Sequence, residues 1–113
     1  MIRILSIKIF KPNVHTNRIY DYSLNLTELA SQHKGFIDSE NFWNYNMDNM
    51  DDSHLFTLSK WQTLIDWDNW KHSSKRIKFH EDCVKDRYIG DILKTTKFYN
   101  LNDREVINNF NGL

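Results

Sequence analysis

The sequence predicts an α+β domain in which four antiparallel strands form one sheet with helices on one face. Stretches with an apolar period of two alternate with stretches of helical period, in the order strand, helix, strand, strand, helix, strand. That order is the split βαβ arrangement of ferredoxin-like domains. We expect the domain to span residues 1–101, and residues 102–113 to form a polar tail with a short helical turn around Val106 and Ile107.

Residues 2–10 are predicted to form the first strand, because alternate residues face opposite sides. One side carries Leu5, Ile7 and Ile9, and the other carries Ile4, Ser6, Lys8 and Phe10. Pro12 and Asn13 favour a turn after it. From about Asn17 the apolar spacing becomes helical, which predicts an amphipathic helix closed by Lys34 and Gly35. Its apolar stripe consists of Ile19, Tyr22, Leu26, Leu29 and Ala30.

Residues 36–44 and 54–61 are predicted to pair as an antiparallel hairpin across the polar turn 46–53. The turn contains Asp48, Asp51 and Asp52, but it lacks the glycine and the closing glutamate of a calcium loop. We interpret these aspartates as turn residues.

The next predicted element is a helix in two pieces. Thr63 and Asp66 form a capping box at its start, and Ser73 or Ser74 is expected to cap the second piece. The second piece is predicted to bury a stripe of Ile77, His80 and Val84, with Phe79 and Cys83 beside it. Gly90 is expected to end it, Ile92 and Leu93 to form an irregular turn, and residues 95–101 to form the last strand.

Composition limits the classes of function. The 15 Lys and Arg residues balance the 15 Asp and Glu residues, which removes a general attraction to nucleic acid or anionic lipid. No apolar run approaches the roughly 20 residues that span a membrane. The single cysteine, Cys83, cannot form an internal disulfide, and three glycines leave no dinucleotide-binding fingerprint. We expect a cytoplasmic protein that binds neither nucleic acid nor a membrane.

The chain is rich in aromatic residues, with four Trp, five Tyr and seven Phe. The predicted strands are also apolar on both faces, although helices cover only one face of such a sheet. Large uncovered apolar faces are rare on soluble monomers. The sequence therefore predicts a homodimer joined through the open sheet face.

Residues 35–80 carry a family resemblance. They run from Gly35 through GFIDSENFWN, the Asp51–Asp52 turn and the strand LFTLSKW to TLIDWDNWKHS. This pattern resembles the antibiotic-biosynthesis monooxygenase (ABM) family, and in outline the resemblance covers residues 2–101. It implies a dimeric α+β barrel. The family hosts cofactor-independent oxidation of aromatic polyketides as well as haem degradation, so the resemblance leaves the activity open.

One spacing resembles the haem-degrading branch of that family. Trp70 is followed ten residues later by His80, where that branch has an iron-ligating histidine. The branch also has an asparagine in the first strand, where this sequence has Leu5 or Ser6. Of the branch's tryptophan, histidine and asparagine, only the first two are therefore present. His80 is alternatively a half-buried helix residue or a proton-transfer group.

Lys71, Lys75, Arg76 and Lys78 form a local basic patch, either a solvated helix face or a site for a carboxylate or propionate. The leading hypothesis is an ABM-like monooxygenase that oxidises a small planar aromatic substrate without a cofactor. The alternatives are a haem-binding or haem-degrading protein with His80 as axial ligand, and a non-catalytic dimeric binding or regulatory module. The expected catalytic residues are Trp70, His80 and Ser6, and the expected substrate-binding residues are Trp61, Trp67, Phe36 and Tyr99.

Overall fold

The computed structural model describes residues 1–11, 16–44, 52–85 and 93–101. The strands are β1 (Ile2–Phe10), β2 (Phe36–Asn44), β3 (Ser53–Trp61) and β4 (Leu93–Asn100). The helices are α1 (Thr16–Ser31), α2 (Leu64–Lys71) and α3 (Ser74–Lys85). Among the described helices, none is long and apolar enough to cross a membrane.

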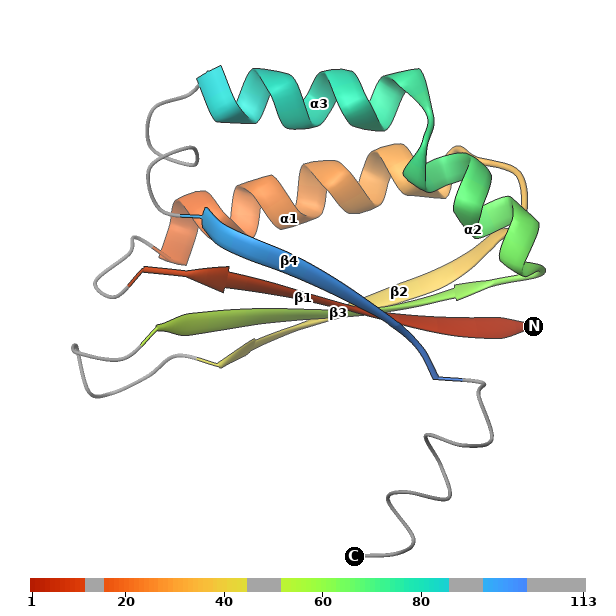
Figure 1. The fold of residues 1–113 in the computed structure, drawn as a ribbon, viewed down its shortest axis with the longest axis horizontal. Coiled ribbons are helices and arrows are strands. Elements are labelled where there is room, and N and C mark those ends of the chain that lie inside the picture. The colour runs from red at the N-terminus through yellow and green to blue at the C-terminus, as the bar shows by residue number, and fades with distance from the viewer. Residues whose placement is uncertain (12–15, 45–51, 86–92, 102–113) are drawn as a thin grey trace, which may run out of the picture.

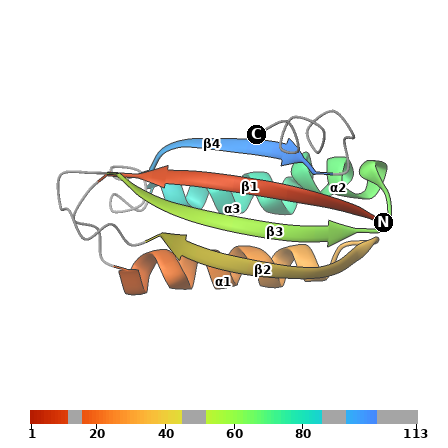
Figure 2. The ribbon, with the colours of Figure 1, turned by 90° about the horizontal axis from the view of Figure 1, so that it is seen from below.

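The four strands form one antiparallel sheet in the order β2-β3-β1-β4. All three helices lie on the same face of this sheet (Figure 1, Figure 2). The predicted α+β, ferredoxin-like class is confirmed, and the observed strands match the predicted ranges to within two residues at each end.

Strict alternation in β1 determines which side chains face the helices. From Ile4 to Phe10 its even-numbered residues are buried, and its odd-numbered residues are half-buried or exposed. Ile4 packs with Ala30, Trp61 and Trp70, while Phe10 belongs to a second apolar cluster. The same alternation also carries Ser6 and Lys8 into the interior, where they are 8% and 5% exposed. The inner face of the sheet is therefore partly polar.

The predicted stripe of α1 is confirmed. Ile19, Tyr22 and Ala30 are buried, and Leu26 and Leu29 are half-buried against the two apolar clusters. The chain then turns through Gly35, which has a φ of +88°. Only glycine adopts this left-handed conformation without strain, as predicted for the helix closure.

Thr63 and Ser73 are confirmed as caps of the two helices, and the Asp66 carboxylate accepts a hydrogen bond from the Thr63 hydroxyl at 2.9 Å. The Asp66 backbone N–H donates to Thr63 Oγ1 at 3.1 Å at the start of α2. The Arg76 backbone N–H donates to Ser73 Oγ at 3.2 Å at the start of α3. These caps fix the positions at which the two short helices begin, and with them the directions of their side chains.

The predicted buried stripe of α3 is wrong. Ile77 is 45% exposed and His80 is also exposed, whereas Phe79 and Cys83 pack against the apolar cluster around Tyr22. The rings of Phe79 and Tyr22 stack with centroids 5.6 Å apart. Contact with α1 therefore rotates α3 so that Phe79 and Cys83 face inward. The side chain of Val84 lies outside the described residues.

The second face of the sheet lies away from the helices, and apolar side chains at its centre are bordered by charged ones that include Arg3, Lys60 and Lys97. Leu5 pairs with Leu58, and Ile7 pairs with Phe56, which pairs in turn with Phe42. No described element covers this face (Figure 2).

Some expectations fall outside the described residues. These are the ones for the polar turn 46–53 (apart from Asp52 and Ser53), for Gly90 and Ile92, and for the tail 102–113, so the domain boundary stays a prediction. Leu93, expected in a turn, begins β4.

Candidate functional site

A cavity lies between the inner face of the sheet and the three helices. Its empty volume is about 530 Å³, including space open to solvent. The lining residues come from all seven elements and are Ile4, Ser6, Lys8, Ser23, Leu26, Thr27, Ala30, Phe36, Ser39, Leu55, Thr57, Ser59, Trp61, Trp67, Trp70, Arg76 and Phe98.

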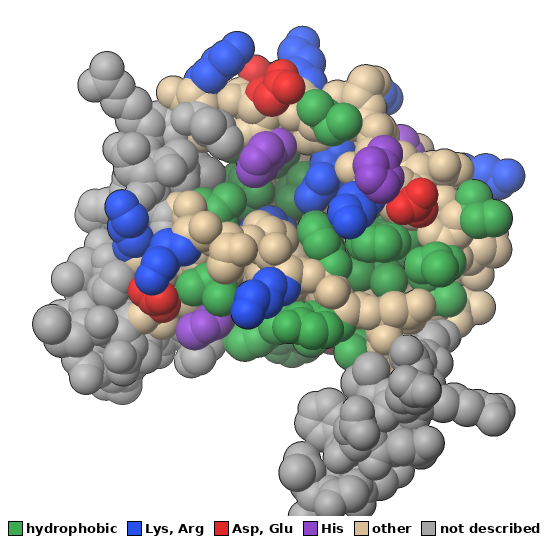
Figure 3. Space-filling view, in the orientation of Figure 1, with side chains coloured by type: hydrophobic (Ala, Val, Ile, Leu, Met, Phe, Trp, Pro, Cys, Tyr) green, Lys and Arg blue, Asp and Glu red, His purple; other side chains and the backbone are tan. Residues whose placement is uncertain are grey.

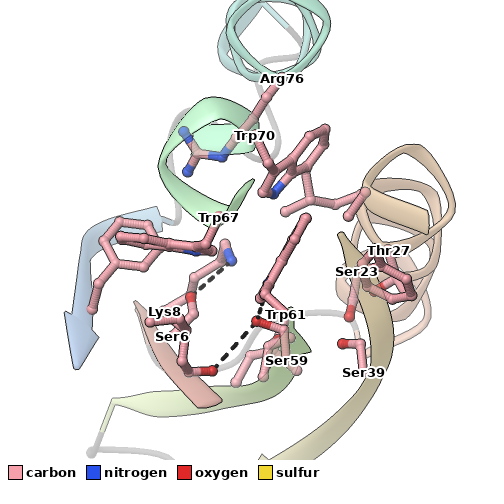
Figure 4. A pocket seen from close by; sticks show the side chains of 17 residues that line it. Ser6, Lys8, Ser23, Thr27, Ser39, Ser59, Trp61, Trp67, Trp70 and Arg76 are labelled. Atoms are coloured by element: carbon pink, nitrogen blue, oxygen red, sulfur yellow. Dashed lines mark hydrogen bonds between the residues drawn. The ribbon is translucent and has the colours of Figure 1, made fainter. Parts of the chain in front are cut away.

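The floor of the cavity is formed by β1 and β3. Trp61 is 1% exposed, and its indole Nε1 donates to Ser59 Oγ at 3.0 Å. Ser59 Oγ in turn donates to the carbonyl of Ile4 at 3.4 Å. This chain of hydrogen bonds holds the Trp61 indole upright in the cavity (Figure 4). Trp61 is thereby a fixed part of the apolar lining.

The roof is formed by two tryptophans of α2. Trp70 is 6% exposed and contacts the His33 ring edge-on at 5.0 Å, which fixes its orientation. Trp67 is half-buried and meets Phe98 of β4 edge-on at 5.6 Å. Because Thr63 caps α2, it determines where these two indoles lie.

Basic side chains border the aromatic surface on the side of the cavity near β4. Lys71 Nζ lies 4.9 Å from the Phe98 ring centroid, and the Arg76 guanidinium lies 5.6 Å from it. Lys and Arg side chains beside apolar ones are also visible in the space-filling view (Figure 3). Cations over aromatic faces are attracted by the ring quadrupole.

Two cationic side chains enter the cavity itself. Lys8 reaches in from β1, and its Nζ donates to Ser6 Oγ at 3.3 Å. Arg76 reaches in from α3 and donates to the Lys71 carbonyl at 3.1 Å. Both charged groups extend into the space beside Trp67 (Figure 4). Neither forms an ion pair with a carboxylate of the described residues.

Burial shifts the pKa values of Lys8, Arg76 and Tyr22. Desolvation, followed by repulsion from Arg76, lowers the pKa of Lys8 from 10.5 to about 8. Desolvation also lowers the pKa of Arg76. Tyr22, whose ring lies 6.0 Å from Lys8 Nζ, has its pKa raised to about 12, mainly by burial and also by Cys83. The cavity therefore holds excess positive charge in a poorly hydrated place.

The structure brings five of the seven predicted site residues together. Those that line the cavity are Ser6, Phe36, Trp61, Trp67 and Trp70. His80 is exposed on α3 and does not line it. Tyr99 is 44% exposed and pairs with Leu5 on the opposite face of the sheet.

Sequence reasoning did not assign Lys8, Arg76 or Phe98 to the site. The alternation of β1 places Lys8 on the face of Ile4 and Phe10, but the opposite face, with Leu5, Ile7 and Ile9, is the more apolar, so the pattern alone did not indicate that the lysine faces the interior. Arg76 was recognised only as part of a basic patch. In the structure Lys75 and Lys78 are exposed, and Arg76 alone of the four lines the cavity.

Comparison with solved structures identifies the fold. The chain superposes on SnoaB, a cofactor-independent oxygenase from Streptomyces nogalater, with a TM-score of 0.60, 6% identity, and coverage of 88% of this chain and 92% of that one. A Bacillus cereus protein proposed to be an antibiotic biosynthesis monooxygenase gives 0.57, at 15% identity and coverage of 91% and 96%. The chain has the fold of the antibiotic-biosynthesis monooxygenases. The predicted resemblance to the ABM family is thus confirmed at the level of fold.

A third structure with this ABM fold, a Deinococcus radiodurans protein also proposed to be such a monooxygenase, gives a TM-score of 0.54 at 12% identity, covering 85% of this chain and 89% of that one. No family model matches the sequence, and no curated protein is significantly similar to it. Within the described residues, no three His, Cys, Asp or Glu side chains are grouped so as to bind a metal ion.

Proposed function

We propose that this protein is an ABM-type monooxygenase that oxidises a small planar aromatic substrate without a cofactor. The observation that carries the proposal is the cavity walled by Trp61, Trp67 and Trp70 within the ABM fold. An aromatic lining of this kind suits a flat ring system, and the surrounding apolar side chains keep water away from it.

The proposed chemistry needs only the substrate and oxygen. An aromatic CH acid such as an anthrone loses a proton, and its anion passes one electron to O2, giving a substrate radical and superoxide. These combine at carbon to a peroxide, which takes up a proton and loses water. The net change converts CH2 and O2 into C=O and H2O, and no external reductant is consumed.

The protein's part is to bind the substrate and to stabilise its anion. Trp61 and Phe36 would support the ring from the sheet, while Trp67 and Trp70 would cover it from α2. Ser6, which accepts the hydrogen bond from Lys8, would donate its own proton toward a substrate oxygen. Such fixed donors in a cavity of low polarity stabilise developing negative charge far better than water does.

We further propose that two subunits associate through the uncovered face of the sheet, in the cytoplasm. The apolar cross-strand pairs of that face, Ile7 with Phe56 and Leu5 with Leu58, support the first part. An exposed apolar surface of this kind on a soluble protein usually marks an interface.

Oxygen consumption tests the proposed reaction. The protein, dialysed against a chelator and free of flavin absorbance, is mixed with anthrone while an oxygen electrode records uptake and mass spectrometry follows incorporation from 18O2. We expect uptake above the uncatalysed rate and one labelled oxygen in the product. Trp70→Ala should lower the rate, whereas Ile65→Ala, at an exposed position of α2, should not. Uptake equal to that of buffer alone would refute the proposed activity and favour a binding module.

The haem hypothesis loses its main support because His80 lies on the exposed face of α3 rather than in the cavity wall. A hemin titration is the direct test. Under the proposed function we expect no Soret shift that depends on His80. A shift that His80→Ala abolishes would restore the haem hypothesis.

A further inference from the structure

The cavity contains a charge that the protein does not neutralise. Lys8 is 5% exposed, and its ammonium group has one hydrogen bond, to Ser6 Oγ at 3.3 Å. An ammonium group has three protons to donate, so two remain without a partner among the described residues. Burying a charged amine in this state costs free energy that a nonpolar side chain of the same length would not.

Arg76 increases this imbalance. It faces the same space from α3 and lowers the proton affinity of Lys8 by repulsion. The one described hydrogen bond of its guanidinium is to a backbone carbonyl, that of Lys71, so its charge is also not neutralised within the described part of the chain. The remaining polar groups of the lining are the indole N–H groups of its three tryptophans and the hydroxyls of Ser6, Ser23, Thr27, Ser39, Thr57 and Ser59.

A ligand with a negative oxygen would resolve the imbalance. An oxyanion beside Lys8 and Arg76 would accept charge-assisted hydrogen bonds from both, which are about twice as strong as neutral ones. The apolar part of such a ligand would lie against the indoles of Trp61 and Trp67, on the walls around the two cations (Figure 4).

We propose that this cavity binds a planar aromatic ligand carrying an anionic oxygen group, a carboxylate or a phenolate, and that Lys8 and Arg76 bind that group. The proposal rests on the proposed function for the identity of the site and names the class of its substrate. It concerns binding, so it does not require that oxidation takes place.

The titratable groups around Lys8 determine how binding depends on pH. Arg76 faces it from α3, and Tyr22 faces it from α1, with Cys83 of α3 acting on Tyr22. The strands β3 and β4 place Leu55 and Thr96 opposite it, and neither of these titrates. The lysine pKa of about 8 means that part of the free protein carries a neutral amine near pH 8. An anion should draw a proton onto that amine as it binds.

Calorimetric titration with two matched probes tests the proposal. 2-Naphthoate and 2-naphthamide have the same ring system and nearly the same shape, but only the first is an anion at pH 7. We expect the naphthoate to bind at least about tenfold more tightly, as one desolvated charge-assisted contact would give. At pH 8, titrations in buffers of different ionisation enthalpy should show net proton uptake for the naphthoate alone.

Variants assign the selectivity to the two cations. Lys8→Met and Arg76→Gln should each lower the affinity for 2-naphthoate about tenfold and leave that for 2-naphthamide within about twofold. Lys78→Met removes the same charge from an exposed position on α3 and should change neither. A melting curve for each variant confirms that the protein is folded during the titration.

Three results would overturn the proposal. These are equal affinity for the two probes, no binding of either, or an equal loss of both in Lys8→Met, which would make the lysine merely structural. Failure of the proposed function gives a different result. Selective naphthoate binding without oxygen uptake would refute the oxidation and support the anion site. Oxygen uptake together with equal binding of the two probes would support the oxidation and refute the anion site.

Discussion

The backbone of Gly35 lies directly against the Asp66 carboxylate, so that a β-carbon at Gly35 would overlap the Asp66 side chain. Asp66 is at the same time the residue whose backbone N–H is capped by Thr63. The contact therefore places the start of α2 against the start of β2. Since α2 carries Trp67 and Trp70, one glycine determines how closely the roof of the cavity approaches the sheet.

Gly35→Ala should accordingly destabilise the protein. The substitution meets both an overlap with Asp66 and a φ of +88°, which an alanine adopts only with strain. We expect the free energy of unfolding in urea to fall by about 2 kcal/mol or more. Lys34→Ala, at the exposed neighbouring position, is the control and should change it little. A Gly35→Ala variant as stable as the wild type would contradict the contact.

The cap of α2 gives a second prediction. Thr63→Ala removes the acceptor of the Asp66 N–H and should lower the free energy of unfolding by about 1 kcal/mol. Thr63→Ser retains the hydroxyl and should lose much less. Denaturation followed by tryptophan fluorescence measures both variants, because Trp67 and Trp70 lie on the helix that the cap begins. Equal losses for the two variants would show that the hydroxyl is not the stabilising group.

The buried charge of Lys8 predicts a dependence of stability on pH. Its pKa is about 8 in the folded protein and 10.5 in the unfolded chain, so between these values the unfolded chain binds the additional proton. The stability contribution is complete above pH 10.5, and it is lost as the pH falls through 8. Between pH 7.5 and 10 we therefore expect the free energy of unfolding to rise, by up to about 3 kcal/mol from this group.

Lys8→Met is the matched variant for this measurement. It should be more stable than the wild type at pH 7, because it removes a desolvated charge, and it should lack the rise above pH 8. The series ends at pH 10, because the raised pKa of Tyr22, about 12, makes stability fall with pH beyond that point. Parallel curves for variant and wild type would show that Lys8 is not the group responsible. Residues of binding sites often lower the stability of a protein, so we expect some substitutions in this cavity to stabilise it.

Patterns of residues close together in the chain were enough to predict the strands and the helix starts. The period of two in residues 2–10 is enough to predict a strand with Lys8 on the face of Ile4 and Phe10, and Thr63 and Asp66 are enough to start a helix. These features depend on neighbours along the chain, so they are visible in the sequence. The order of elements then follows the split βαβ arrangement.

The orientation of α3 was not predictable in this way. Its sequence offers two apolar stripes, one with Ile77 and one with Phe79, and the choice depends on the Tyr22 ring that Phe79 meets across the helix pair. That contact joins residues far apart in the chain. For the same reason Arg76 was assigned to a surface patch, and His80 to a site that α3 turns it away from.

The open face of the sheet gives the final prediction. Phe56 lies at the centre of this face, paired with Ile7 of β1 and Phe42 of β2. Phe42 is 51% exposed in the single subunit. If this face joins two subunits, light scattering should give the wild type twice the subunit mass of 13.7 kDa. Phe56→Lys should give one subunit mass, because two buried lysines would face each other without partners across the interface.

Ile65→Lys is the matched control for this substitution. Ile65 is 72% exposed on α2, on the helical side of the molecule, so the same gain of charge should leave the mass of the assembly unchanged. A wild-type protein that stays monomeric at tens of micromolar would refute the interface. Dissociation of both variants alike would attribute the effect to net charge. Dissociation of Phe56→Lys alone would assign the interface to the centre of the open sheet face, because only there does the added charge lose its water when two sheets meet.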